Sequence, residues 1–302
     1  MLVVGEIEQN VVTISLEYRP PLDLASLLGH FKSHLLPGLE RVTEEWYERV
    51  FHLDGVTGYF RVMKDPRSDS ALQLRVASAA ISSIPLITGR VRQMFDLDTD
   101  VTLVERVMKA QPSLSQLWTA YPGLRIARTW DWFETIITTI LGQLVSVSFG
   151  RTLIRELMES YGERIVHPVT EEIIYLFPTP EVLARADLSE VRTSVLRRRA
   201  INTIAALVAD ETLLLSTAAD AKALRKALLA VPGIGVWSVE YIALRAFGDT
   251  DAFPATDYVL KREIKRHAEL NLKLVCPWRA YAAIYLWKRF AETRGESNES
   301  GL

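Results

Sequence analysis

The chain has 302 residues, of which 49% are hydrophobic and 24% are charged, and its formal net charge at pH 7 is −2. A single cysteine, Cys276, excludes an internal disulfide and a four-cysteine zinc or iron–sulfur site within one chain. The sequence contains neither an apolar run long enough to cross a membrane nor an export signal at its N-terminus, so we expect a cytoplasmic protein. A chain of this length normally divides into two or three domains.

Residues 1–99 contain patterns of both strands and helices. β-Branched residues at 11–20, two runs around Asp54-Gly55 within 42–66, and alternation at 71–79 predict strands. Residues 22–36 and 79–97 have helical spacing. We therefore predict a small antiparallel α+β domain here and assign no chemistry to it.

From about Val101 onward, helical spacing predominates. A Gly and a β-branched run near Leu141–Ser146 predict a break in the longest segment. The polar residues 294–302 are expected to fray. The predicted helical segments are 100–110, 112–121, 129–162, 180–186, 189–210, 221–231, 236–247, 258–267 and 278–293.

A tight turn, Pro232-Gly233-Ile234-Gly235, separates two of these helices. Its composition forces a sharp reversal, and the free N–H groups of the turn open the helix that begins near Val236. Such a turn can bind an anion such as a DNA phosphate. An ordinary helix–turn–helix corner without a ligand is the alternative.

The helix after this turn has two distinct faces. One is apolar and indicates a core contact, whereas the other offers two aromatic rings spaced four residues apart. These rings either pack against a neighbouring helix or form a stacking platform for a base. The apolar face contains Val239, Ile242, Ala243 and Ala246, and the opposite face Trp237, Glu240, Tyr241 and Leu244.

Residues 232–260, PGIGVWSVEYIALRAFGDTDAFPATDYVL, resemble the helix–hairpin–helix motif, Gly/Pro-rich loop and essential Asp of the DNA glycosylase superfamily. Within it the chain is most similar to the bacterial 3-methyladenine DNA glycosylase II family, which excises alkylated bases. The resemblance continues in residues 132–157, 161–187 and 276–287.

This resemblance implies a domain organisation. Residues 1–99 would be an antiparallel α+β domain similar to half of a TATA-binding-protein fold. Residues 132–249 would form a helical domain that carries the helix–hairpin–helix. Residues 100–131 and 250–302 would form a second helical domain that closes the active-site cleft.

By resemblance, Asp257 is the catalytic residue. Local sequence alone shows Thr256-Asp257 as a helix N-cap, and the two roles are compatible because the helix dipole stabilises a carboxylate there. Cleaving an N-glycosidic bond builds positive charge on the sugar, which a fixed anion stabilises while it aligns or deprotonates water. Trp237 occupies the place where strand-cutting relatives carry a Schiff-base Lys. We therefore expect hydrolysis that leaves an intact abasic site.

The resemblance also assigns a base pocket to Trp237, Tyr241 and Trp287. Alkylation makes a purine cationic and favours stacking on electron-rich rings. Trp287 is otherwise a plain core residue. Two residues depart from the family pattern, because Lys288 replaces another aromatic and Glu240 places an acid near the stacking face.

The remaining assignments concern DNA. Leu144 matches the residue that the family inserts into the duplex, or else is a core leucine. The phosphate-binding turn comprises Gly233, Ile234 and Gly235. The backbone carbonyls of Leu229, Val231 and Ile234 match a structural monovalent-cation site, and no cofactor is expected for catalysis.

The net charge of −2 is unusual for a sequence-independent DNA binder. However, residues 222–266 contain eight basic and five acidic residues, a local excess of +3. Lys261 and Lys265 in this region contact phosphates or face solvent. A second basic cluster either meets phosphates or forms a solvated turn, and it consists of Arg192, Arg197, Arg198 and Arg199.

The sequence therefore predicts a monomeric, monofunctional DNA glycosylase that acts in base excision repair on alkylated purines such as 3-methyladenine in double-stranded DNA, with no membrane partner. Two alternatives stay open. One is a non-catalytic helix–hairpin–helix DNA-binding protein in which Asp257 is only a cap. The other is the same fold acting on oxidised or deaminated bases.

Overall fold

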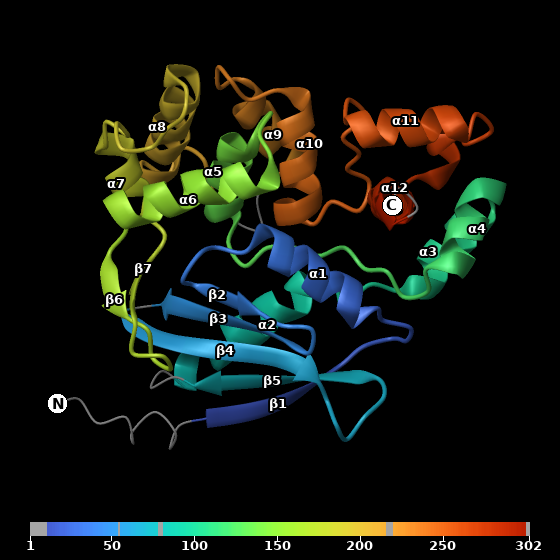
Figure 1. Ribbon diagram of the computed structural model, residues 1–302, viewed down its shortest axis with the longest axis horizontal. Helices are drawn as coiled ribbons and strands as arrows, with labels where there is room; N and C mark the ends of the chain where they lie inside the picture. The colour runs from blue at the N-terminus through green and yellow to red at the C-terminus, as the bar shows by residue number, and fades with distance from the viewer. Residues whose placement is uncertain (1–10, 54, 78–80, 216–219, 300–302) are drawn as a thin grey trace.

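A computed structural model describes residues 11–53, 55–77, 81–215 and 220–299. The N-terminal part contains a five-stranded antiparallel sheet, and helices predominate in the rest of the chain (Figure 1). The predicted α+β class is therefore confirmed. Among the described residues, no helix combines the length and apolar character needed to cross a bilayer.

The sheet has the strand order β1-β5-β4-β3-β2, and all of its pairings are antiparallel. Helices α1 (Leu24–His34) and α2 (Ile84–Met94) contribute to its core, which includes Tyr47, Phe60 and Leu74. Of the hairpin signal at residues 54–55, only Gly55 lies within the described residues, and it has φ +76°. The strands are β1 (Val11–Glu17), β2 (Glu40–Val42), β3 (Trp46–Leu53), β4 (Val56–Lys64) and β5 (Ala71–Ala77).

The helical part follows most of the predicted segments. The expected break lies between α5 and α6, where residues 143–146 are not helical. Its helices are α3 (Val101–Lys109), α4 (Pro112–Ala120), α5 (Trp132–Gly142), α6 (Val147–Tyr161), α7 (Pro180–Arg185), α8 (Val195–Ala209), α9 (Ala221–Leu229), α10 (Val236–Ile242), the π-helix η3 (Ala243–Phe247), α11 (Tyr258–Arg266) and α12 (Arg279–Glu299).

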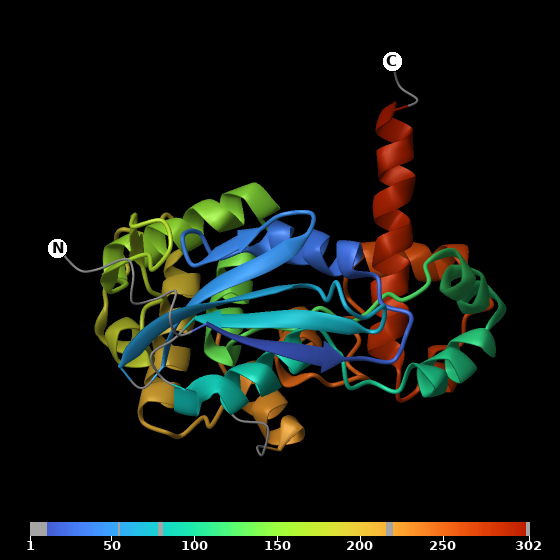
Figure 2. The same cartoon turned by 90° about the horizontal axis from the view of Figure 1, so that it is seen from below.

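Two local predictions were wrong, and one short hairpin was not predicted. A hairpin of β6 (Arg164–Val166) and β7 (Ile173–Tyr175) interrupts the helices, and its strands are too short to show alternation in the sequence. The helix predicted from residue 189 begins at Val195, because Ser194 caps it and Leu188 adopts a positive φ. α12 continues through Glu299 instead of fraying at residue 294, and it projects from the body of the molecule (Figure 2).

Three clusters of buried apolar residues hold the fold. One lies in the sheet domain, one among α5, α6, α8, α9 and α10, and one among α3, α4, α11 and α12. The helix α10–η3 lies between the last two, since Val239 packs into one cluster and Ala243 into the other. Leu244 is consequently fully buried, and its prediction as an outward-facing residue was wrong. The proposed domain boundaries stay a prediction.

A buried arginine joins the sheet to the helices. The Arg49 guanidinium donates to Glu40 at 2.6 Å and to Glu134 of α5 at 2.5 Å. Burial raises the pKa of the Glu134 carboxyl to about 8, against the attraction of Arg49 and with repulsion from Asp131 and Glu40. Two acidic side chains thus share one guanidinium at this junction.

This raised pKa predicts a pH-dependent stability. Folded Glu134 binds a proton between its ordinary pKa of 4.5 and about 8, whereas the unfolded chain has released it. The contribution of Glu134 to the free energy of unfolding is therefore fully present below pH 4.5. It decreases as the pH rises and is lost once the pH passes about 8. We expect Glu134→Gln to flatten this decline in urea denaturation series at about pH 5.5 and 8.5. The exposed control Glu44→Gln should retain the wild-type slope, and an unchanged slope in Glu134→Gln would contradict the assignment.

Candidate functional site

Asp257 lies at the N-cap of α11 and receives three N–H donors. Its Oδ1 accepts the backbone N–H of Leu260 at 3.0 Å, so it is a true helix cap. The Nε1 of Trp237 donates to Oδ2 at 3.0 Å, and the Nε1 of Trp287 donates to Oδ1 at 3.1 Å. The helix N-terminus and these donors stabilise a negative charge at this position. The cap and the functional role predicted for Asp257 are therefore compatible.

The three predicted aromatic residues lie together beside this carboxylate. Trp237 and Tyr241 of α10 are stacked, with ring centroids 5.1 Å apart and an interplanar angle of 12°. Trp287 of α12 meets Tyr241 edge-on at 6.3 Å. All three side chains and Asp257 are half-buried, so none is sealed in the core. Trp287 thus packs against the core of α3, α4, α11 and α12 and also donates its indole N–H to Asp257.

An ion-pair network shapes the loop that leads to Asp257. Arg225 of α9 donates to Glu240 at 2.9 Å and to Asp249 at 2.6 Å. The other carboxylate oxygen of Glu240 accepts the backbone N–H of Phe253 at 3.0 Å. Glu240 therefore holds the loop in place. The acid that the sequence places near the stacking face is thus paired with Arg225 and a backbone N–H group. A pair between Arg279 and Asp251 fastens the same loop to α12.

Lys288, the other departure from the family pattern, is a half-buried residue of α12. Its Nζ forms an ion pair with Glu292 at 3.0 Å and lies 5.9 Å from the ring centroid of Tyr121. Its known contacts thus do not include the Trp237–Tyr241–Trp287 group.

The predicted phosphate-binding turn is joined to the loop between α5 and α6. Gly233 has φ +98°, and Gly235 is the N-cap of α10. The side chain of Gln143 donates to the Gly233 carbonyl at 3.1 Å and to the Ser238 hydroxyl at 2.9 Å. Arg197 at the start of α8 donates to the Gln143 carbonyl. Gln143, to which sequence reasoning gave no role, therefore connects the two loops.

Next to Gln143, Leu144 is fully exposed and has φ +55°. An exposed leucine in a left-handed conformation is not a core residue, and such strain is frequent at functional sites. Two further apolar residues, Leu196 and Val236, are exposed on the adjoining segments. A hollow of about 370 Å³ adjoins Pro232 and is lined by Leu196 and Arg199, among others. Exposed apolar residues at three joined segments indicate a surface for a macromolecular partner.

The basic residues divide into two groups. Arg192 pairs with Glu156 at 2.5 Å, Arg197 binds Gln143, and Arg198 donates to the Val191 carbonyl at 2.9 Å, so these three hold the chain together. Arg199, Lys261 and Lys265 are exposed. Phosphate contacts by this arginine cluster stay a prediction, and Arg199 is its one member without an intramolecular contact described above.

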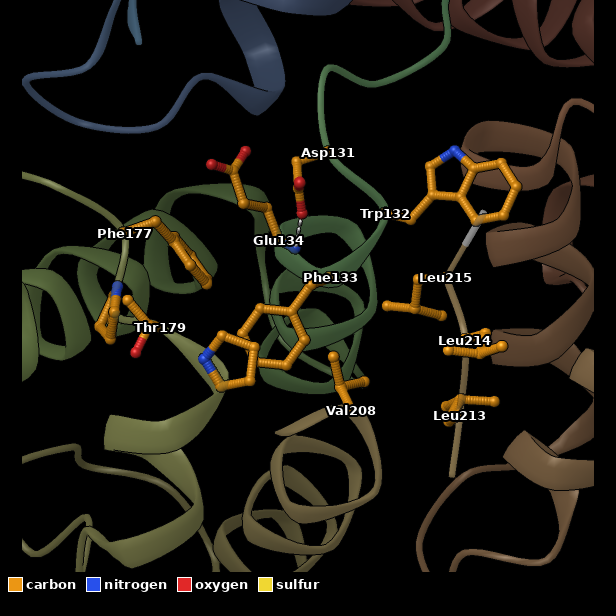
Figure 3. Close-up of a pocket in the computed structure, with 12 residues that line it drawn as sticks. Asp131, Trp132, Phe133, Glu134, Phe177, Thr179, Val208, Leu213, Leu214 and Leu215 are labelled. Atoms are coloured by element: carbon orange, nitrogen blue, oxygen red, sulfur yellow. Dashed lines mark hydrogen bonds between the residues drawn. The ribbon is translucent and has the colours of Figure 1, made fainter. Parts of the chain in front are cut away.

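A cavity of about 380 Å³ lies elsewhere, at the start of α5 (Figure 3). Phe133, Phe177 and Leu214 line it, together with two acids that point to one side of it. One of these acids, Asp131, caps α5, and the other, Glu134, binds Arg49. This cavity shares no lining residue with the Asp257 group, and its acids already serve the fold.

The turn glycines offer a matched test. A side chain at Gly233 would meet a positive φ and would place Cβ 3.1 Å from Leu196 Cγ, whereas Gly235 has φ −96° and no heavy atom within 4 Å of an added Cβ. We expect Gly233→Ala to lower the free energy of unfolding by about 1–3 kcal/mol and Gly235→Ala to change it by less than about 0.5 kcal/mol. Urea denaturation of both variants measures this difference, and equal effects would contradict the assigned turn geometry.

The arrangement around Asp257 has a defined chemical capacity. An anchored carboxylate stabilises positive charge that develops within a few ångströms, and electron-rich rings bind a flat or cationic ring system. The exposed hairpin and Leu144 lie on segments that are joined to the same helix, α10. Together they suit a ligand that presents a flat ring alongside a polyanionic chain.

Comparisons with known proteins agree with this description. Residues 13–131 match the family described as AlkA N-terminal domain. DNA-3-methyladenine glycosylase 2 of Escherichia coli (strain K12) is 30% identical over 284 residues, which cover 90% of this chain and 96% of that protein. A Mycobacterium tuberculosis protein named "Probable bifunctional transcriptional activator/DNA repair enzyme AlkA" is 33% identical over 286 residues. The match covers 92% of this chain, which therefore spans only 57% of the M. tuberculosis protein.

A solved structure has the same fold. The 3-methyladenine DNA glycosylase from Archaeoglobus fulgidus superposes with a TM-score of 0.72. The match covers 90% of this chain and 97% of that one, at 21% sequence identity. The two chains therefore share a fold over most of their length.

Proposed function

The chain belongs to the DNA-3-methyladenine glycosylase 2 (AlkA) family, and on this basis we propose that it is a monofunctional DNA glycosylase that hydrolyses the N-glycosidic bond of alkylated purines in double-stranded DNA. The reaction is a step of base excision repair. The observation that carries the proposal is the anchored carboxylate of Asp257, which two indole N–H groups hold beside a stacked aromatic pair.

The pocket receives a nucleotide flipped out of the duplex. Its base contacts Trp237, Tyr241 and Trp287, and its sugar lies next to Asp257. Stacking stabilises a bound base by about 1–3 kcal/mol, which is comparable to the cost of extruding a damaged nucleotide. A pocket of this kind recognises π-surface and charge more than a hydrogen-bond pattern, so we propose a broad range of alkylated bases that includes 3-methyladenine.

The chemical step uses the negative charge of Asp257. As the C1′–N bond breaks, the electron pair leaves with the base and positive charge develops on the sugar. Asp257 stabilises that charge and takes a proton from the water whose oxygen bonds to C1′. Because α10 presents Trp237 and no amine at the first turn after the hairpin, water is the nucleophile and the DNA strand stays intact.

The turn at residues 232–235 and the loop between α5 and α6 provide the proposed contacts with DNA. The backbone N–H groups at Gly233, Ile234 and Gly235 bind a phosphate at the start of α10. Leu144 enters the duplex and fills the space left by the flipped nucleotide, which its full exposure and its strained backbone support. Lys261, Lys265 and Arg199 are exposed basic residues available for further phosphate contacts.

A structural monovalent cation at the hairpin is compatible with the residues present. The Val231 carbonyl accepts the Ile234 N–H at 3.1 Å and retains a second lone pair. The carbonyls of Leu229, Val231 and Ile234 would hold the ion, which would add positive charge near the phosphate. A monomeric state, a cytoplasmic location and independence from a catalytic cofactor belong to the same proposal.

The direct test is base release from duplex DNA treated with a methylating agent. We expect released 3-methyladenine and 7-methylguanine, identified by chromatography, and an abasic product that is cleaved only after alkali treatment. DNA binding without base release would instead favour a non-catalytic helix–hairpin–helix protein. Release confined to oxidised or deaminated bases would favour the same fold with another lesion class.

A further inference from the structure

A buried arginine, Arg245, lies next to the aromatic rings of Tyr241 and Trp287. Trp237, Tyr241 and Arg245 follow one another at intervals of four residues along α10 and η3, and Arg245 is only 6% exposed. Its guanidinium carbon lies 5.6 Å from the ring centroid of Tyr241 and 5.7 Å from that of Trp287. A fixed positive charge therefore lies against two of the three rings proposed to bind the base.

The charge of Arg245 has no carboxylate partner among the described residues. One guanidinium nitrogen donates to the Ala127 carbonyl at 2.8 Å, and Nε has no hydrogen-bond partner there. Burial lowers the pKa of the Arg245 guanidinium, and the Tyr241 hydroxyl acts in the opposite direction. An arginine nevertheless stays protonated in proteins, so the charge persists.

Two histidines of α1 also come near Arg245. The rings of His30 and His34 stack with centroids 4.2 Å apart, and His34 Nδ1 lies 3.0 Å from the His30 carbonyl. Desolvation lowers the pKa of the half-buried His30 imidazole, and the charge of Arg245 lowers it further. The pKa of the exposed His34 is also lowered by desolvation, against the raising effect of its contact with the His30 carbonyl. The histidines are therefore neutral at pH 7 and neither compensate nor add to the charge of Arg245.

This charge acts differently on two classes of leaving group. When a cationic alkylpurine departs, the electron pair of the C1′–N bond neutralises the base, so a nearby cation gives no help and opposes binding. When a neutral purine such as hypoxanthine departs, the same pair makes the base anionic until solvent protonates it. A buried cation stabilises this anion where it forms, in a site of low effective dielectric.

We propose that Arg245 determines specificity and allows the pocket to release neutral purines in addition to cationic ones. The inference rests on the proposed glycosylase function and names the residue that sets its substrate range. Arg245 acts on the charge of the departing base, whereas Asp257 acts on the charge of the sugar.

The test compares two lesions in one protein. Single-turnover base release is measured on duplexes that contain either hypoxanthine or 7-methylguanine at the same position, for wild type, Arg245→Met and Arg245→Lys. We expect Arg245→Met to lower the ratio of the hypoxanthine rate to the 7-methylguanine rate at least about tenfold, and Arg245→Lys to keep it within about threefold. Because the two rates share the same active fraction, partial misfolding cancels in the ratio.

A second buried arginine provides the matched control. Arg125 is 3% exposed and donates to the Pro21 carbonyl at 3.1 Å, but it contacts none of the pocket rings. Arg125→Met should leave the ratio unchanged even if it lowers both rates.

An unchanged ratio in Arg245→Met, or wild-type release of 7-methylguanine without any release of hypoxanthine, would overturn the role of Arg245. Failure of the wild type to release 7-methylguanine would instead remove the proposed function itself.

Discussion

Asp257→Asn is expected to lower the single-turnover rate of base release from methylated duplex DNA by at least about 1,000-fold. The substitution removes the negative charge that stabilises the cationic sugar. It also removes the carboxylate that accepts a proton from the attacking water. In the wild-type protein both carboxylate oxygens accept an indole N–H, so one of the two indoles faces an amide N–H₂ in the variant. Release of 3-methyladenine and 7-methylguanine, quantified under enzyme excess, measures the loss.

The choice of Asn separates chemistry from folding. Asn caps a helix about as well as Asp, so the hydrogen bond to Leu260 N–H is retained and the free energy of unfolding should change by less than about 1 kcal/mol. Asp220→Asn, at the exposed N-cap of α9, provides the same chemical change away from the site. If Asp257→Asn released bases at the wild-type rate, the proposed mechanism would have to be abandoned.

Trp237→Ala is expected to reduce kcat/KM for base release by about 100-fold, because it removes both a stacking surface and a hydrogen bond that orients Asp257. Trp237→Phe retains most of the ring surface but not the N–H. We expect Trp237→Phe to lower kcat/KM for base release about tenfold, mainly through a lower kcat. The two variants therefore divide the effect between binding of the base and orientation of the carboxylate.

Trp46→Ala provides the control for the loss of a large ring. Trp46 lies on β3, where Arg41 and Arg61 contact its ring. None of these contacts involves the Asp257 group. Its replacement should leave kcat/KM near the wild-type value. Equal losses in Trp46→Ala and Trp237→Ala would indicate a general effect on folding and would contradict a role for Trp237 in the pocket.

The sheet domain contributes more to the candidate site than its sequence suggests. Its helix α1 carries the histidine pair next to Arg245, and Ala127, whose side chain packs in the sheet-domain core, provides the carbonyl that binds the guanidinium. Arg49 fastens the sheet to α5. The N-terminal segment therefore lies near the Arg245 guanidinium through α1, and the sheet-domain core extends to Ala127.

Local patterns in the sequence determined much of this protein. The turn at Pro232, the break between α5 and α6, the cap at Asp257 and the strand pattern of the N-terminal domain each depend on residues within a few positions of one another, because turns, caps and side-chain periodicity are short-range effects. The aromatic face of α10 was visible for the same reason. Family resemblance then identified which of these features belong to one site.

The tertiary structure alone decided how distant residues combine. The Asp257 carboxylate meets indoles 20 and 30 residues away, Gln143 reaches the hairpin across 90 residues, and Arg245 reaches Ala127 across 118. Spacing in a sequence carries no record of such contacts, because they arise only when separate cores pack together. For the same reason Glu240 turned out to be a partner of Arg225, Leu244 was buried in one of the helical cores, and the charge of Arg245 came to lie against two aromatic rings.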